Sequence, residues 1–300
     1  MERQPKIGII IVNFNGYKDT IDCLNSLRKI TYSNYVIIVV DNASNNESVA
    51  ELKKTIHTEV LLCSESNTGF SGGNNIGIKY ALEHDCDYCL LLNNDTEVDQ
   101  DFLSFLVEVA EQSKGKTVVT PKIRYYSDKT KIWYAGGMLN NITSRTNHIG
   151  INETDEGQYD ESKPVTFVSG CCMLIPREIV DSVGLMEESF FLYCEDLEYC
   201  LRITGKGFEL RYEPHSIIYH KVNASTGKAS NLVTYYTVRN KMYIIRSFFK
   251  GWRKIPAIIY ALSECMKRVL FGEYKLSIVI KGFKDYARKV IGPIPSSELK

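Results

Sequence analysis

The stretch that most constrains the fold runs from Tyr88 to Thr96 and has the sequence YCLLLNNDT. Its apolar half is typical of a β-strand buried on both faces, as in a parallel sheet covered by helices. The run then ends in two amides, a carboxylate and a hydroxyl group. Because ligands of open α/β sheets bind beyond the carboxyl ends of the strands, this polar end is a candidate site. The alternative is a helix cap, since a helix is expected at about 99–113 and these residue types are good N-caps.

Two earlier strands have the same kind of ending. An apolar run at 6–13 ends in Asn13 and is followed by Asn15, and a run at 35–40 is followed by Asp41. Helical patterns separate these strands from one another and from a third strand at 59–63. Strands that alternate with helices predict a parallel sheet with right-handed crossovers. The polar ends should then meet at one edge of the sheet and form a ligand crevice.

A glycine-rich loop opens into the helix that precedes Tyr88. Its glycines stand at 69, 72, 73 and 77, which is neither the spacing of a dinucleotide-binding turn nor that of a P-loop. Such glycines predict close backbone approach at the N-terminus of a helix. That position also favours a phosphate or diphosphate nearby.

The second half of the chain has a different character. Strands are expected at 117–125 and 165–175, a hairpin is expected from 131–138 and 142–149, and short strands are expected at 209–212 and 217–220. This pattern predicts a mixed sheet that offers a surface for an acceptor.

The adjacent acids Glu195 and Asp196 begin a short helix after the aromatic run FFLYC. Acids at a helix start can simply favour the helix dipole. Against that interpretation, the aromatic run before the helix should place at least one acid in a partly dry pocket. Its pKa would rise there toward a value useful for a general base.

The formal net charge of zero conceals an asymmetry. Residues 239–300 contain fourteen Lys or Arg and four Asp or Glu, so this segment carries +10 and the rest carries −10. Basic residues mixed with apolar ones over 239–292 predict amphipathic helices that bind an anionic membrane surface. The alternative is that these helices pack on the body of the protein or on a second copy in a homodimer. A nucleic-acid partner is not expected, because no recognised module is present.

Nine cysteines, mostly inside apolar runs, do not indicate a disulfide framework. No apolar run approaches the roughly 18 residues of a membrane span. The first strand begins almost at the N-terminus, without a signal peptide. We therefore expect a cytoplasmic protein, peripheral at the inner face of the cell membrane.

Together these motifs resemble family 2 glycosyltransferases, and in particular the rhamnosyltransferase-like branch. The resemblance covers about residues 5–250 and rests on VNFNG, DNAS, NTGFSGGNNIG, LNNDT and VGLMEESFFLYCED, which occur in this order. It implies an α/β fold of the GT-A type: a Rossmann-like, mostly parallel sheet flanked by helices, with a mixed acceptor-side sheet and C-terminal helices. The implied catalytic domain is 1–238, with a nucleotide-binding half at 1–97 and an acceptor-binding half at 98–238. Residues 239–300 then form the basic helical tail.

The resemblance also implies roles for individual residues. Asp196 matches the catalytic base, with Glu195 as the less favoured bearer. Asp95 matches the last aspartate of the D-x-D motif and, with His220, would hold Mg²⁺ or Mn²⁺. Asp41 would contact the nucleotide. The implied donor-binding residues are Asn13, Asn15, Asp41, Asn67, Gly69, Gly73, Asn74, Asn93, Asn94, Asp95 and Gly170.

One position departs from the family pattern, because Asn93 stands where D-x-D has its first aspartate. The amide removes one negative charge, so metal binding is expected to depend on the phosphates of the donor. The expected reaction moves one sugar, with inversion, from a nucleotide diphosphate-sugar to a glycan or lipid-linked acceptor in cell-surface polysaccharide synthesis. dTDP-rhamnose or a UDP-sugar is the favoured donor. The alternative function is a nucleotide-sugar-binding module without turnover.

Overall fold

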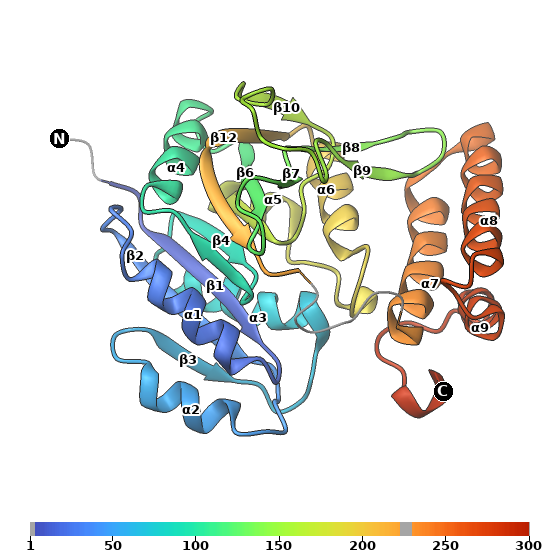
Figure 1. Ribbon diagram of the computed structural model, residues 1–300, viewed down its shortest axis with the longest axis horizontal. Helices are drawn as coiled ribbons and strands as arrows, with labels where there is room; N and C mark the ends of the chain where they lie inside the picture. Colours follow the sequence, from blue (N-terminus) through green and yellow to red (C-terminus); the bar gives the residue numbers. More distant parts are fainter. Residues whose placement is uncertain (1–3, 223–229, 300) are drawn as a thin grey trace.

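The computed structural model describes residues 4–222 and 230–299. One ten-stranded sheet runs through its centre, with helices to either side and a separate group of helices at one end (Figure 1). The strands of the N-terminal half are β1 (Ile7–Asn13), β2 (Tyr35–Asp41), β3 (Val60–Cys63) and β4 (Tyr88–Leu92). The helices between and after them are α1 (Tyr17–Leu27), α2 (Ser48–Thr55), α3 (Gly69–Glu83) and α4 (Phe102–Gln112).

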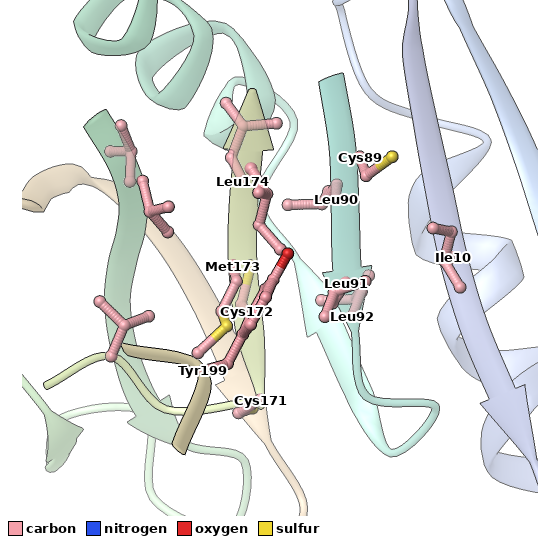
Figure 2. Packing of buried hydrophobic residues seen from close by; sticks show 14 of the residues in the cluster. Ile10, Cys89, Leu90, Leu91, Leu92, Cys171, Cys172, Met173, Leu174 and Tyr199 are labelled. Atoms are coloured by element: carbon pink, nitrogen blue, oxygen red, sulfur yellow. The ribbon is translucent and has the colours of Figure 1, made fainter. Parts of the chain in front are cut away.

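This half is parallel, as the sequence predicts. β1 pairs in parallel with both β2 and β4, and β2 pairs with β3. Every residue of β4 is buried, which confirms a strand covered on both faces. In Figure 2 the side chains of Leu90, Leu91 and Leu92 lie between β1 and the neighbouring β11. The carboxyl ends of β1, β2 and β4 therefore share one edge of the sheet.

The glycines of α3 allow that helix to lie close against β1. A Cβ atom added at Gly77 would stand 2.3 Å from Ile10 Cγ2, and one added at Gly73 would stand 2.7 Å from Val12 Cγ1. The prediction of close backbone approach is confirmed.

The second half extends the same sheet in mixed orientation. Its strands are β5 (Thr96–Val98), β6 (Thr117–Tyr125), β7 (Ile132–Tyr134), β10 (Lys163–Val165), β11 (Cys172–Pro176) and β12 (Glu209–His220). The order across the sheet is β10-β12-β6-β11-β4-β1-β2-β3, with β5 also on β12 and β7 on β6. β8 (Gly137–Leu139) and β9 (Thr146–His148) form a separate antiparallel pair. Helices α5 (Arg177–Val183) and α6 (Glu195–Gly205) and the 3₁₀ turn η1 (Glu188–Phe190) follow β11.

Three expectations about this half were wrong in detail. The strand expected at 165–175 is two short strands separated by residues 166–171, because the intervening segment leaves the sheet and contacts α6. The strands expected at 209–212 and 217–220 are one strand, β12, with an irregularity between Glu213 and Ile217. The expected hairpin forms only as β8–β9, while β7 pairs with β6.

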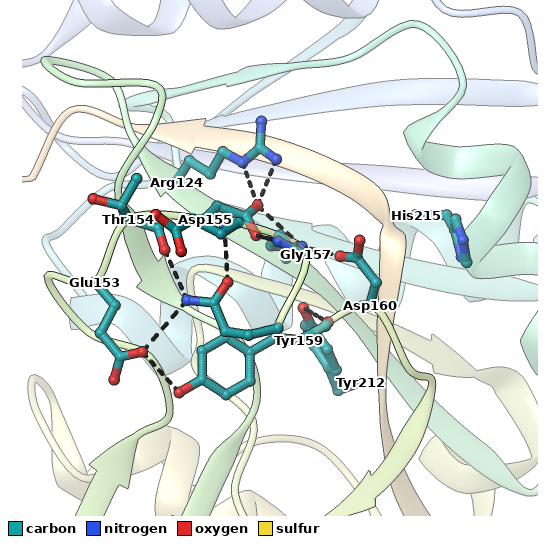
Figure 3. Close-up of polar contacts among 12 residues, drawn as sticks. Arg124, Glu153, Thr154, Asp155, Gly157, Tyr159, Asp160, Tyr212 and His215 are labelled. Carbon is teal, nitrogen blue, oxygen red and sulfur yellow. Dashed lines mark hydrogen bonds and ion pairs between the residues drawn. The ribbon is translucent and has the colours of Figure 1, made fainter.

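A buried ion cluster fixes the loop at 153–160 to the mixed half. The Lys122 ammonium group is almost fully buried and lies 3.0 Å from Asp155 Oδ2 and 2.6 Å from Asp160 Oδ1. Arg124 donates two further hydrogen bonds to Asp155, as Figure 3 shows. Because a lysine buried without a counter-charge is costly, this pairing accounts for the ordered loop.

The C-terminal helices are α7 (Asn231–Phe248), α8 (Lys254–Leu270) and α9 (Leu276–Ala287), with short 3₁₀ turns η2 (Gly251–Arg253) and η3 (Ser296–Leu299). The boundary predicted between 238 and 239 falls inside α7. Arg239, counted as the first basic residue of the tail, is fully buried and donates to the carbonyls of Ser189 and Gly292. No helix in the described ranges has the length and apolar character needed to cross a bilayer.

Candidate active site

The ends of β1 and β2 are joined by a polar network. Asn13 donates through Nδ2 to Asp41 Oδ2 at 2.7 Å, and the Ser44 hydroxyl donates to the same oxygen at 2.7 Å. The Ser44 N–H donates to Asp41 Oδ1, and the Asn15 N–H donates to the Ser44 hydroxyl. Asp41 is thus nearly fully buried and held by its neighbours, while Asn15 is exposed at the rim.

The same network reaches the end of β4. Asn94 Nδ2 donates to the Thr20 hydroxyl at 3.1 Å, and that hydroxyl donates to Asn13 Oδ1 at 2.9 Å. Thr20 lies on α1 and was not predicted from the sequence. Asn93 and Asn94 are partly exposed at the end of β4. The three strand ends are therefore brought together as the sequence predicts.

Asn42, the residue after Asp41, organises the glycine-rich loop. Its side chain donates to the Gly69 carbonyl at 2.9 Å and to Asn67 Oδ1 at 3.2 Å, and it accepts the Thr68 N–H at 3.0 Å. Asn67 also accepts the Gly69 N–H. Asn42 was not among the predicted site residues, although its place in the polar ending of β2 was a signal for it.

The beginning of α3 contacts the segment that precedes α6. Gly69 has a φ of +72°, and an added Cβ would stand 2.1 Å from the Phe191 carbonyl oxygen. The next N–H, that of Phe70, donates to the same carbonyl. Within α3 itself, Asn74 is buried and donates to the Phe70 carbonyl at 2.9 Å. Donor binding by Asn67, Gly69, Gly73 and Asn74 stays a prediction.

Asp95 and His220 face each other. Asp95 Oδ1 lies 3.2 Å from His220 Nε2, and both residues are 8% exposed. The contact arises because β5 pairs antiparallel with β12, with Thr96 opposite His220. Burial lowers the pKa of His220, but the neighbouring Cys171 sulfur and the Asp95 carboxylate raise it to about 10. The Trp133 ring packs edge-on against the imidazole, at 4.6 Å between ring centres.

These two side chains fit a divalent cation that is shared with a phosphate ligand. A carboxylate and a neutral imidazole are donors that Mn²⁺ accepts, so His220 would release its proton when a cation binds. Mg²⁺ typically takes one or two carboxylates plus substrate phosphates. His220 Nδ1 is buried and has no hydrogen-bond partner among the described residues. The described part of the chain holds no group of three or more His, Cys, Asp or Glu side chains placed to bind a metal. The donor set therefore suits a cation whose remaining ligands come from a diphosphate and water.

Asp196 and Glu195 begin α6 but occupy different environments. Asp196 is partly exposed; its Oδ2 accepts the Gly170 N–H at 3.1 Å and its Oδ1 accepts the Leu197 N–H at 2.7 Å. Burial among protein atoms raises the pKa of Asp196, and these N–H groups oppose the rise. Glu195 is only 7% exposed, and its Oε2 has no partner in the described structure. Burial, together with the charge of Asp196, raises the pKa of Glu195 to about 8.

The segment that leads into α6 is held from two sides. On one side, Asn75 of α3 donates to the Met186 carbonyl and to Glu188 Oε1, and it accepts the Met186 N–H. On the other side, Asn240 of α7 donates to the carbonyls of Phe190, Leu192 and Tyr193 at 2.8–2.9 Å. Neither asparagine was predicted, because both act through partners distant in sequence.

One dipeptide connects the carboxylate of α6 to the Asp95–His220 pair. The Gly170 N–H donates to Asp196, while the Cys171 carbonyl accepts the Asn93 N–H and its sulfur neighbours His220. Consecutive Cα atoms are only about 3.8 Å apart. Asp196 and His220 therefore contact neighbouring residues of one short segment, Gly170–Cys171.

The model of the family described as "Glycosyl transferase family 2" matches residues 8–184, which include the ends of β1, β2 and β4 and the Gly170–Cys171 segment. The chain belongs to glycosyl transferase family 2.

Individual relatives agree with this assignment. The chain is 26% identical over 251 residues to the "Low-salt glycan biosynthesis hexosyltransferase Agl10" of Haloferax volcanii, covering 81% of this chain and 76% of that protein. It is 25% identical over 251 residues to the "dTDP-rhamnosyl transferase RfbF" of Shigella flexneri, covering 80% of each. The predicted family and its rhamnosyltransferase-like branch are confirmed.

A solved structure supports the fold. The crystal structure of GalNAc-T7 with UDP, GalNAc and Mn²⁺ superposes with a TM-score of 0.63 at 17% identity, over 82% of this chain. The present chain spans about half, 48%, of that one. The predicted GT-A fold of this glycosyltransferase is confirmed.

Proposed function

We propose that this glycosyltransferase moves a single sugar, with inversion, from a nucleotide diphosphate-sugar to a glycan or lipid-linked glycan acceptor in cell-surface polysaccharide synthesis. dTDP-rhamnose or a UDP-sugar is the favoured donor, a choice supported by the relative named as a dTDP-rhamnosyl transferase. The observation that carries the proposal is the Gly170–Cys171 segment, in which Gly170 contacts Asp196 and Cys171 contacts His220 of the Asp95–His220 pair. A proton acceptor thus stands beside a site suited to a diphosphate.

Asp196 acts as the general base in this proposal. Its carboxylate takes the proton of an acceptor hydroxyl while that oxygen forms a bond to the anomeric carbon of the donor. The bond from that carbon to the diphosphate breaks on the opposite face, and the electron pair leaves with the diphosphate. The raised pKa suits this role, because a base is most effective when its pKa approaches the working pH. The two N–H groups that hold Asp196 fix its orientation.

Asp95 and His220 would hold Mg²⁺ or Mn²⁺ against the donor diphosphate. When bound, the cation would supply positive charge that stabilises the leaving diphosphate. Asn93 contributes an amide after β4 instead of a second carboxylate, so the site carries one negative charge fewer. Asn13, Asn15, Asp41 and Asn94 are proposed to line the donor side, with the loop at 67–74 and Gly170.

We also propose that the enzyme works at the cytoplasmic face of the cell membrane, as a peripheral protein. The support is the positive charge of residues 239–300, which would attract anionic lipid headgroups. The alternative partner of the same segment is a second copy of the chain, in a homodimer.

The function is tested with a panel of UDP-, dTDP- and GDP-sugars in the presence of Mn²⁺. Thermal stability reports binding, and released nucleotide diphosphate reports turnover. We expect one sugar nucleotide to do both. Thermal stabilisation without release of nucleotide diphosphate, even with glycan acceptors supplied, would favour a binding module without turnover. Asn93 is the only residue that argues for that alternative. No response to any sugar would contradict both functions.

The metal role has a separate test. In Asp95→Asn, the Mn²⁺ concentration needed for thermal stabilisation by the nucleotide should rise at least tenfold, because an amide is a poorer ligand than a carboxylate. Asp99→Asn, a carboxylate at the start of the next loop, is the control. Unchanged Mn²⁺ dependence in Asp95→Asn would contradict the assignment.

A further inference from the structure

Helix α8 carries two apolar faces, and only one of them is packed. Ala257, Ala261 and Cys265 are buried, in the clusters that α8 forms with α7 and α9. A second set recurs at intervals of three or four residues and is exposed. We call it the α8 stripe: Ile255, Ile259, Leu262, Met266 and Leu270.

The stripe is long and open. At 1.5 Å per residue, the 17-residue helix spans about 25 Å. Trp252 extends the stripe at one end and Phe271 at the other, with 65% and 73% of their surfaces exposed, and Leu270 is 80% exposed. In Figure 1, α8 forms the outer edge of the molecule, on the side of α7 away from the sheet. A soluble protein rarely leaves so continuous an apolar surface without a partner.

The helices that carry the stripe are rich in unpaired positive charge. Residues 250–289 contain ten Lys or Arg and three Asp or Glu. The three acids are occupied by Arg268 and Lys281. The other eight cations form no salt bridge in the described ranges: Lys250, Arg253, Lys254, Lys267, Lys275, Lys284, Arg288 and Lys289.

We propose that the α8 stripe and these cations form a docking surface for an anionic lipid bilayer, with α8 lying in the headgroup region. An amphipathic helix with an apolar face and flanking Lys and Arg has the chemistry that such an interface binds. A second copy of the chain is the less suitable occupant. A two-fold contact would set the same basic surface against itself, and the resulting repulsion would oppose association.

The surface is linked to the chemistry of the proposed function, on which this part of the inference rests. α8 packs on α7, and Asn240 of α7 holds the carbonyls of the segment that precedes Asp196. Docking would therefore hold the catalytic segment one helix away from the bilayer. The acceptor best suited to that position is a glycan carried on a membrane lipid.

The test is cosedimentation of the full chain with vesicles of phosphatidylcholine, with and without about one-third phosphatidylglycerol. The wild-type chain should bind the anionic vesicles, and salt should weaken binding because it screens the exposed charges. Ile259→Gln with Met266→Gln should lower the partition coefficient at least tenfold, since two apolar side chains lose their burial. Arg253→Gln and Lys267→Gln should each lower it about fivefold at low salt.

The matched control is Ile151→Gln, which changes an exposed apolar side chain of the catalytic body and should leave binding unchanged. Thermal melts check that every variant folds. Absence of wild-type binding at low salt, or equal binding by the stripe variant, would overturn the proposal. So would a wild-type dimer that persists on vesicles and dissociates in the stripe variant, because the stripe would then be a contact between copies.

Vesicle binding needs no turnover, so the two proposals fail separately. A wild-type chain that transfers sugar to a water-soluble acceptor but does not bind anionic vesicles would overturn the docking surface alone. Normal docking by a chain that transfers no sugar would overturn the proposed function alone.

Discussion

Replacing Glu195 with glutamine should stabilise the protein, and the gain should grow with pH. The Glu195 carboxyl is buried, one of its oxygens has no partner in the described structure, and its pKa is raised from 4.5 to about 8 by burial and by Asp196. Between these two pH values the unfolded chain has lost a proton that the folded chain keeps. Stability therefore falls as pH rises through this window, at about 1.4 kcal/mol per pH unit.

The full window corresponds to roughly 5 kcal/mol, and because Asp196 shares the same pocket we expect Glu195→Gln to gain about 2–5 kcal/mol at pH 8. At pH 4.5 the gain should fall below about 0.5 kcal/mol, because the Glu195 carboxyl is then neutral in the folded chain and only half ionised in the unfolded chain. Urea unfolding of both proteins at pH 4.5, 6 and 8 measures this difference. The exposed Glu161→Gln is the control and should change stability by less than about 0.5 kcal/mol at every pH.

A stability difference between Glu195→Gln and wild type that does not vary with pH would refute the reasoning. It would mean that Glu195 is solvated or paired in solution. The same variant also separates the two acids in function, because it should retain transfer if Asp196 is the base.

Two further substitutions test the supports of the site. Asn240→Ala removes three hydrogen bonds to the backbone before α6. At about 1 kcal/mol each, their loss should lower the free energy of urea unfolding by about 2–4 kcal/mol and should slow sugar transfer. An unchanged unfolding curve would show that water replaces these bonds. Gly69→Ala places a Cβ against the Phe191 carbonyl and should cost at least about 2 kcal/mol. Gly207→Ala has a similar positive φ with nothing within 4 Å, so it measures backbone strain alone; equal costs in the two variants would exclude the clash.

The polar strand ends could be predicted from sequence because the signal is local. Each apolar run ends in Asn or Asp, and parallel order follows from the alternating helices, so Asn13, Asp41 and Asn94 were placed together correctly. The carboxylate pair at the start of α6 was equally local, and the predicted rise in pKa is found in both acids, with burial as its main cause.

The contacts that complete the site depend on distant pairing and could not be predicted in this way. His220 meets Asp95 because β5, a three-residue strand absent from the sequence analysis, pairs with β12. Asn240 was assigned to a basic tail, yet α7 packs it against the catalytic segment. α8 is apolar on two faces, and composition alone does not indicate which face is packed.

The central claim is that Asp196 removes the proton of the acceptor hydroxyl, and Asp196→Asn tests it most directly. Single-turnover transfer is measured at saturating donor, and the donor Kd is measured by calorimetry on the same protein. We predict a rate lowered by about 10²–10⁴-fold with the donor Kd within about twofold of wild type. Transfer at the wild-type rate would contradict the claim, as would a loss of donor affinity large enough to account for the loss of rate.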